Sequence, residues 1–265
     1  MSTITLATLK ACREANTPFS CLTAYDATLA RLASDAGIEV LLVGDSLGMV
    51  LQGHDSTLPV TVEDIVYHTG CVARAGAKSL VMADMPFMSN ATTASLLENA
   101  GQLMRAGAHM VKLEGEAWLA EGVNALTRRG VPVCVHMGLT PQSVNAFGGY
   151  KVQGRDIAHA QRIVEDAQHL EAAGAAIILL ECVPASLGRA VRAAVGVPVI
   201  GIGAGPDVDG QILVMHDMLG ATTGRRPRFV KDFLQEGGSI SGAFQAYRNA
   251  VLQRTFPAPE HCFQG

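Results

Sequence analysis

Short apolar runs recur along the whole chain, and a segment with helical or loop character follows each of them. Such runs are typical of strands buried on both faces, and their alternation with helical patterns indicates a parallel sheet. The eight predicted strands are Phe19–Ala24, Val40–Val43, Ser79–Ala83, His109–Leu113, Val131–Val135, Ala176–Leu180, Val197–Ile202 and Gln211–Met215. Eight such units in 265 residues predict an α/β fold, a single-domain (β/α)8 TIM barrel over residues 1–265.

An open, doubly wound sheet is the alternative fold. We favour the barrel because no glycine-rich fingerprint follows the first strand, as a dinucleotide-binding sheet would show. The first 18 residues predict a short helical lead-in, and the C-terminal region predicts helices near Val230–Leu234 and Ser241–Gln253. Two long glycine-containing loops are also predicted, Leu47–Pro59 and Met137–Asp156. Loops of this length inside a compact domain are usually functional.

Five successive predicted strands end at an ionisable residue. These residues are Asp45, Asp84, Glu114, His136 and Glu181. In a parallel barrel the carboxyl ends of all strands lie on one rim, where barrel enzymes place their catalytic groups. One charge after an apolar run is usually just the start of a solvated loop, but five in succession favour an active site.

Asp45 and Asp84 end neighbouring strands, so their carboxylates are expected to face one gap suited to a hard cation. Oxygen ligands favour Mg²⁺, with Mn²⁺ as a substitute. Lys112 and Glu114 are two residues apart in one strand and therefore point to the same side. Lys112 is interpreted as a cation for a substrate anion or, alternatively, as the partner of an acid in a salt bridge.

Glu181 is the candidate general base, because a carboxylate behind an apolar strand suits proton abstraction near neutral pH. His136 either contacts a ligand or is a satisfied structural histidine. The run Gly201–Gly205 could bind a phosphate, but tight backbone packing is favoured because two acids follow it. His216 and Asp217 are expected to finish the eighth strand, with a His–Asp dyad as the alternative.

Composition narrows the class of partner. Hydrophobic residues make up 49% of the chain and charged residues 17%, which predicts a heavily buried protein whose surface is partly covered by other subunits. The net charge is −4, with no block of like charges, so neither nucleic acid nor a membrane is expected as a partner. The N-terminus has no apolar signal core, and the expected location is cytoplasmic.

Several longer runs carry a more specific signal. They are Val43–Gly48, Gln52–Pro59, Ala83–Phe87, Val111–Glu114, His136–Gln142, Phe147–Lys151, Leu180–Pro184 and Gly201–Gly205. Together they resemble the ketopantoate hydroxymethyltransferase family, and the resemblance covers nearly the whole chain. It implies a (β/α)8 barrel that assembles as a homodecamer and binds one Mg²⁺ per subunit.

The resemblance also implies a reaction. A hydroxymethyl group would pass from 5,10-methylenetetrahydrofolate to 3-methyl-2-oxobutanoate and give 2-dehydropantoate for pantothenate synthesis. By position, the family's metal ligands fall on Asp45 and Asp84, with Glu114 in or next to the metal shell. The family's oxo-acid contacts fall on Asp45, Ser46, Asp84 and Lys112, and its base falls on Glu181.

Two rival functions remain at this stage. A related barrel lyase would act on 2-oxo acids without folate, but such enzymes usually carry a cysteine on a flexible loop, and neither long loop contains one. A non-catalytic scaffold or binding module would be recognised by a lack of divalent-metal binding.

Overall fold

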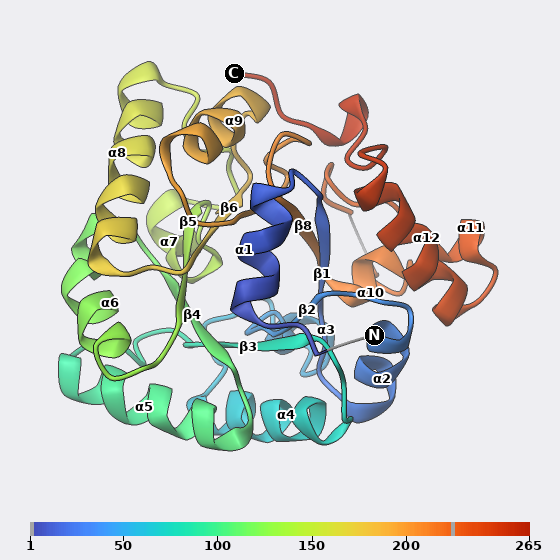
Figure 1. Ribbon diagram of the computed structural model, residues 1–265, viewed down its shortest axis with the longest axis horizontal. Helices are drawn as coiled ribbons and strands as arrows, with labels where there is room; N and C mark the ends of the chain where they lie inside the picture. Colours follow the sequence, from blue (N-terminus) through green and yellow to red (C-terminus); the bar gives the residue numbers. More distant parts are fainter. Residues whose placement is uncertain (1–2, 224–225) are drawn as a thin grey trace.

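The computed structural model describes residues 3–223 and 226–265, and its centre is a closed barrel of parallel strands (Figure 1). The strands pair in chain order, and β8 pairs with β1 to close the barrel. Their bounds are β1 Phe19–Thr23, β2 Val40–Val43, β3 Leu80–Asp84, β4 Met110–Glu114, β5 Val133–Gly138, β6 Ile177–Glu181, β7 Val199–Ile202 and β8 Gly210–Leu213. This architecture confirms the predicted (β/α)8 barrel.

Helices surround the strands. Their bounds are α1 Leu6–Glu14, α2 Ala27–Asp35, α3 Leu47–Val50, α4 Val62–Arg74, α5 Thr93–Ala106, α6 Ala120–Thr127, α7 Val144–Phe147, α8 Ile157–Ala173, α9 Ala185–Ala194, α10 Met215–Met218, α11 Leu234–Gly237 and α12 Ile240–Leu252. Local capping fixes several of their starts. Asp26 accepts hydrogen bonds from two backbone N–H groups of α2, and Thr61 forms a capping box with Asp64 at α4.

The strand register brings the predicted site residues together. Strands β2, β3 and β4 are buried along their whole length, as their branched apolar residues require. In the parallel ladders Asp84 lies opposite Lys112, and Glu114 lies opposite His136. The carboxyl ends of β3, β4 and β5 therefore place these four side chains next to one another.

Several boundary predictions were wrong, and three of these errors change where residues named above lie. Strand β5 continues to Gly138, which places His136 inside the strand. Strand β8 ends at Leu213, so His216 and Asp217 belong to the short helix α10 and do not finish a strand. No helix spans 230–234; α11 begins at Leu234, whose N–H donates to the Asp232 carboxylate at 3.0 Å. A side chain that binds the backbone two residues ahead favours a turn over an earlier helix start.

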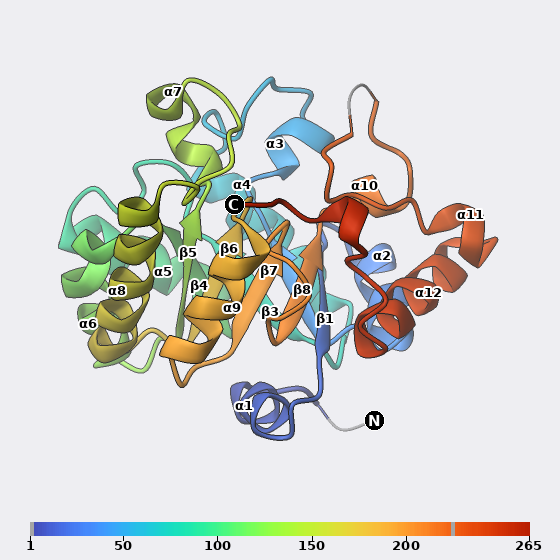
Figure 2. The ribbon, with the colours of Figure 1, turned by 90° about the horizontal axis from the view of Figure 1, so that it is seen from above.

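The two long loops follow β2 and β5 and contain short helices that the sequence did not indicate. Helix α3 lies in the first loop, and a 3-10 turn, Pro141–Ser143, leads into α7 in the second. Figure 2 shows α3 and α7 at the carboxyl end of the barrel and α1 below the opposite end. The long loops therefore lie on the rim that carries the ionisable residues.

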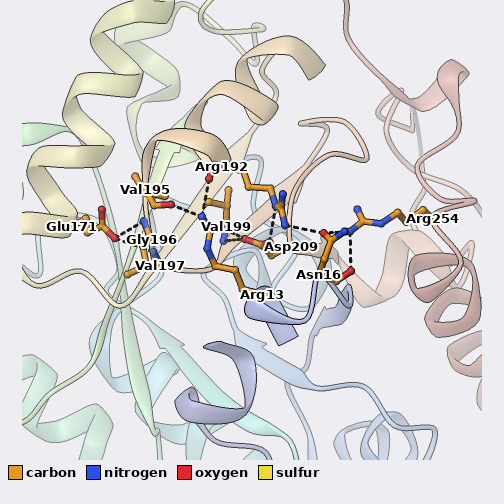
Figure 3. A network of polar contacts seen from close by, with 10 residues as sticks. All are labelled: Arg13, Asn16, Glu171, Arg192, Val195, Gly196, Val197, Val199, Asp209 and Arg254. Carbon is orange, nitrogen blue, oxygen red and sulfur yellow. Dashed lines mark hydrogen bonds and ion pairs between the residues drawn. The ribbon is translucent and has the colours of Figure 1, made fainter. Parts of the chain in front are cut away.

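Helix α1 is held to the amino end of the barrel by a charged network (Figure 3). Its Arg13 donates to the fully buried Asp209 carboxylate and to the backbone carbonyl of Val195. The N–H of Val199 donates at 2.9 Å to Oδ2 of Asp209, the oxygen that Arg13 contacts. Arg192 of α9 donates to the other oxygen, Oδ1, at 2.7 Å. A nearby pocket of about 450 Å³ is lined by residues that include Lys10, Arg13 and Arg192, far from the strand-end carboxylates.

None of the helices in residues 3–223 and 226–265 has the length and apolar character that crossing a bilayer requires.

Candidate active site

Three carboxylates meet just below the carboxyl rim. Asp45 follows β2, Asp84 ends β3 and Glu114 ends β4, and one ligand oxygen of each lies within 4.8 Å of the others. All three are buried, and Asp84 is only 1% exposed. The sequence places them at a loop rim, whereas the structure encloses them beneath it. Like charges confined in a buried space repel one another unless cations balance them.

Lys112 is the ammonium that faces this cluster. Its Nζ lies 2.9 Å from Asp84 Oδ1 and 3.2 Å from Glu114 Oε1, and its side chain is buried. Burial opposes its charge, but Asp84, Glu114 and Asp45 outweigh burial and raise the pKa of Lys112. Lys112 is therefore charged and forms the salt bridge that one interpretation of the sequence gave.

One lysine does not balance three carboxylates. Burial, followed by Asp84 and Glu114, raises the pKa of Asp45 well above its usual value. Burial also raises the pKa of Asp84, against the opposing effect of Lys112. In contrast, Lys112 and His136 outweigh burial and lower the pKa of Glu114 to about 2. The raised pKa values of Asp45 and Asp84 thus reflect a closed site in which the carboxylates outnumber their cationic partners.

The geometry of Asp84 fits a further cation. Its Oδ2 accepts a hydrogen bond from the N–H of Asp45 at 3.1 Å. Its Oδ1 lies 2.9 Å from Lys112 Nζ, and apart from this salt bridge the buried atom has no hydrogen-bond partner among the described residues. A carboxylate oxygen can accept more than this one contact, and an all-oxygen donor set suits Mg²⁺. The residues present therefore fit a hard divalent cation.

His136 connects this cluster to the candidate base. Its Nε2 lies 3.2 Å from Glu181 Oε2, and its Nδ1 lies 3.1 Å from both Glu114 Oε1 and Lys112 Nζ. Nδ1 either donates to the carboxylate or accepts from the ammonium. Burial and Lys112 oppose protonation of the ring, but the two glutamates outweigh them and raise the pKa of His136. Glu181 therefore has a polar neighbour that its apolar strand did not indicate.

Ser46 opens α3 directly after Asp45. Its Oγ lies 2.9 Å from the hydroxyl of Tyr25, a buried residue that follows β1. Ser46 is thus fixed beside the carboxylate cluster, in the place that the sequence gave it.

The sequence did not identify two further residues at this site, and both come from the loop after β5. Gln142 donates from its side chain to Asp45 at 2.9 Å and from its backbone to Glu114 at 3.0 Å. Tyr150 contacts the sulfur of Met49 in the other long loop at 3.8 Å. Partial burial, followed by the negative charges of Glu181, Asp45 and Glu114, raises the pKa of Tyr150. The run His136–Gln142 was the only available signal for Gln142.

The glycine run after β7 has a packing role in this structure. Gly203 has φ of +62°, and a Cβ there would lie 2.9 Å from Phe229. A Cβ on Gly205 would lie 2.5 Å from the side chain of Ala185 in α9. The backbone thus approaches its neighbours too closely for a side chain, which agrees with the packing interpretation.

Comparisons with solved structures agree on the fold. Phosphonopyruvate hydrolase superposes with a TM-score of 0.63 at 18% identity, over 96% of this chain and 95% of the other. 2,3-Dimethylmalate lyase, a member of the PEP mutase/isocitrate lyase superfamily, superposes with a TM-score of 0.60 at 16% identity, over 91% of this chain and 90% of the other. At such low identity these neighbours show the barrel fold alone.

Comparisons of sequence are far closer. A protein of Chromohalobacter salexigens is 68% identical over 99% of this chain and its own full length, and one of Marinobacter nauticus is 62% identical over 98% and 99%. Both carry the name 3-methyl-2-oxobutanoate hydroxymethyltransferase. The family model for ketopantoate hydroxymethyltransferase matches residues 3–259. The chain therefore belongs to the ketopantoate hydroxymethyltransferase family.

Proposed function

We propose that the protein transfers a hydroxymethyl group from 5,10-methylenetetrahydrofolate to 3-methyl-2-oxobutanoate and forms 2-dehydropantoate. Membership in the family supports the transferase activity. The main structural support for the proposed reaction is the buried cluster of Asp45, Asp84 and Glu114, which faces Lys112. The cluster lies at the same end of the barrel as Glu181. Such a cluster suits an oxo acid whose proton at C3 must be removed.

Asp45 and Asp84 would hold Mg²⁺, with Glu114 in or next to the metal shell. The oxygen of Asp84 that lacks a hydrogen-bond partner supports its role as a ligand. When bound, the metal would supply Lewis acidity that stabilises negative charge on the oxygens of an oxo acid. Both oxygens of Glu114 already accept hydrogen bonds, from Lys112 and from the N–H of Gln142, which favours a place at the edge of the shell.

Three polar side chains would orient the oxo acid. Lys112 would place its ammonium near the carboxylate or the developing oxygen anion of the substrate, where a fixed positive charge lowers the barrier. Ser46, held by Tyr25, would donate or accept a hydrogen bond beside Asp45. His136, between Glu114 and Glu181, would hold the base in position or contact the substrate.

Glu181 would take the proton from C3 of the substrate. Its carboxylate stands at the end of β6, and its side chain is 14% exposed, so it can reach a ligand at the rim. The carbon nucleophile formed in this way would attack the one-carbon unit carried by the folate. The loops after β2 and β5, which meet at Met49 and Tyr150, would cover the reacting groups.

An assay of folate-dependent hydroxymethylation tests this proposal. Purified protein, stripped with EDTA and then supplied with Mg²⁺, should convert 3-methyl-2-oxobutanoate to 2-dehydropantoate only when both metal and methylenetetrahydrofolate are present. Equal turnover in EDTA would refute the metal requirement, and turnover without the folate would refute the cosubstrate.

The homodecamer and the cytoplasmic location stay predictions from the sequence. A sedimentation experiment that finds a stable, fully active monomer of 27.8 kDa would remove the first of them.

A further inference from the structure

We propose that Gln142 is a positioning residue that fixes the carboxylates of the divalent-metal site before the metal binds. This inference rests on the metal site proposed above and adds to it a residue from the loop after β5. Gln142 would hold the carboxylates in position and would not itself contact the metal.

Gln142 touches the ends of three neighbouring strands. Its side-chain Nε2 donates to Asp45 Oδ2 at 2.9 Å and to the carbonyl of Met85 at 3.0 Å, and its backbone N–H donates to Glu114 Oε2 at 3.0 Å. Met85 directly follows Asp84. One residue therefore links the segments that carry all three clustered carboxylates.

The contacts require an amide at this position. Both partners of Nε2 are acceptors, a carboxylate oxygen and a carbonyl oxygen. If the amide were reversed, Oε1 would face these two oxygens and the contact would be repulsive, so the N–H₂ end must point to them. A neutral donor also differs from Lys112, because it holds Asp45 without neutralising the charge that attracts a cation.

Local sequence explains how the backbone N–H reaches Glu114. Pro141 occupies the first position of the 3-10 turn Pro141–Ser143, where its fixed φ favours a helical start. The turn is closed by a hydrogen bond of 2.8 Å from the N–H of Ser143 to the carbonyl of Thr140. The N–H of Gln142 is thus left free to donate outside the turn.

Without a metal, the three clustered carboxylates repel one another and would otherwise move apart. Hydrogen bonds from a rigid turn hold two of them in place, so less rearrangement is needed when a cation enters. Partners of this kind typically contribute about 10- to 100-fold to metal affinity. Loss of the Gln142 side chain should therefore weaken Mg²⁺ binding more than it affects folding.

The test compares Gln142→Met, which keeps the volume and removes the donor, with Gln142→Asn, which keeps the amide but shortens its reach. Gln161→Met is the matched control, because Gln161 donates to the carboxylate of Glu165 at 2.9 Å on the exposed face of α8. Mg²⁺ is titrated into each metal-free protein by calorimetry, after circular dichroism has confirmed folding. Both Gln142 variants should raise the Kd for Mg²⁺ by about 10-fold or more, and Gln161→Met should not change it.

Turnover gives a second measurement. The Gln142 variants should need more Mg²⁺ for half-maximal rate and should recover most of kcat at saturating Mg²⁺. If they bind Mg²⁺ as the wild type does while Asp84→Asn loses binding, the role of Gln142 is wrong and the metal site stands. If Asp84→Asn also binds Mg²⁺ normally, the metal site itself is wrong.

Discussion

Buried carboxylates at the two ends of the barrel differ in how completely their charges are paired. At the amino end, Asp209 is fully buried, and both of its oxygens are paired, one with Arg13 and the N–H of Val199, the other with Arg192 (Figure 3). At the carboxyl end, three carboxylates share one lysine, and Asp84 Oδ1 has no hydrogen-bond partner among the described residues. The first arrangement is electrostatically complete, and the second is open to a cation.

This difference separates a structural charge from a functional one. Removal of a carboxylate from water costs free energy, which only well-placed partners can offset. Asp209 has those partners within the chain and ties α1 to the starts of β7 and β8. Asp45 and Asp84 lack a full set of such partners, so an additional cation at this site would stabilise the folded protein. Perturbed groups of this kind cluster at active sites.

The largest effect is expected from loss of a carboxylate at the open end. Asp84→Ala and Asp45→Ala should each abolish metal-dependent turnover, because a ligand of the proposed Mg²⁺ is removed. Each variant should still fold, since one fewer buried carboxylate reduces repulsion within the cluster. Calorimetric titration with Mg²⁺ checks the claim, and unchanged Mg²⁺ affinity in either variant would show that the metal assignment is wrong.

Loss of the carboxylate at the closed end should affect stability and leave chemistry unchanged. Asp209→Ala leaves two partly buried arginines without their partner and should lower the free energy of unfolding by about 3–5 kcal/mol. The matched control is Asp207→Ala, which breaks an exposed pair with Arg189 and should cost less than about 1 kcal/mol. Guanidinium denaturation measures both.

The specific activity of folded Asp209→Ala should equal that of the wild type. If this variant lost activity without losing stability, the proposed division between the two ends would fail.

A smaller effect is expected from pH. Because the folded-state pKa of Asp45 is raised, its contribution to stability is present below the unfolded pKa and lost as pH rises through the folded pKa. Mg²⁺ binds the deprotonated form and should compensate this loss. The rise in Tm on addition of Mg²⁺ should therefore be larger at about pH 8 than at about pH 5.5. Asp45→Asn should show a weaker dependence, and an opposite trend in the wild type would contradict the charge balance.

The sequence predicted the barrel and the strand-end residues because both depend on local patterns. Apolar runs mark strands buried on both faces, and the two-residue period of a strand placed Lys112 and Glu114 on one side. The carboxyl ends of parallel strands share a rim, so the sequence predicts that Asp45 and Asp84 lie together. Their distances, their burial and the missing partner of Asp84 Oδ1 required the structure.

The residues that hold the site in place were not predictable in the same way. Gln142 lies in a loop without periodicity, and its partner Asp45 is 97 positions away in the chain. Arg13 and Asp209 are 196 positions apart. Contacts of this kind arise only when the barrel closes, and no local pattern records them. The misplaced end of β8 has a similar cause, because the apolar residues after Leu213 enter α10 and no longer pair in the sheet.

The most direct test of Glu181 as the general base is a hydrogen-exchange experiment without folate. It follows by NMR the exchange of the C3 proton of 3-methyl-2-oxobutanoate in D₂O. Wild-type protein with Mg²⁺ should catalyse this exchange, because proton abstraction by Glu181 precedes attack on the one-carbon unit. Glu181→Gln keeps the size of the side chain and removes the proton acceptor, so exchange should slow by about 10² or more while Mg²⁺ binding is retained. Exchange at the wild-type rate in this variant would contradict the account and would transfer the role of base to His136, whose Nε2 lies 3.2 Å from Glu181.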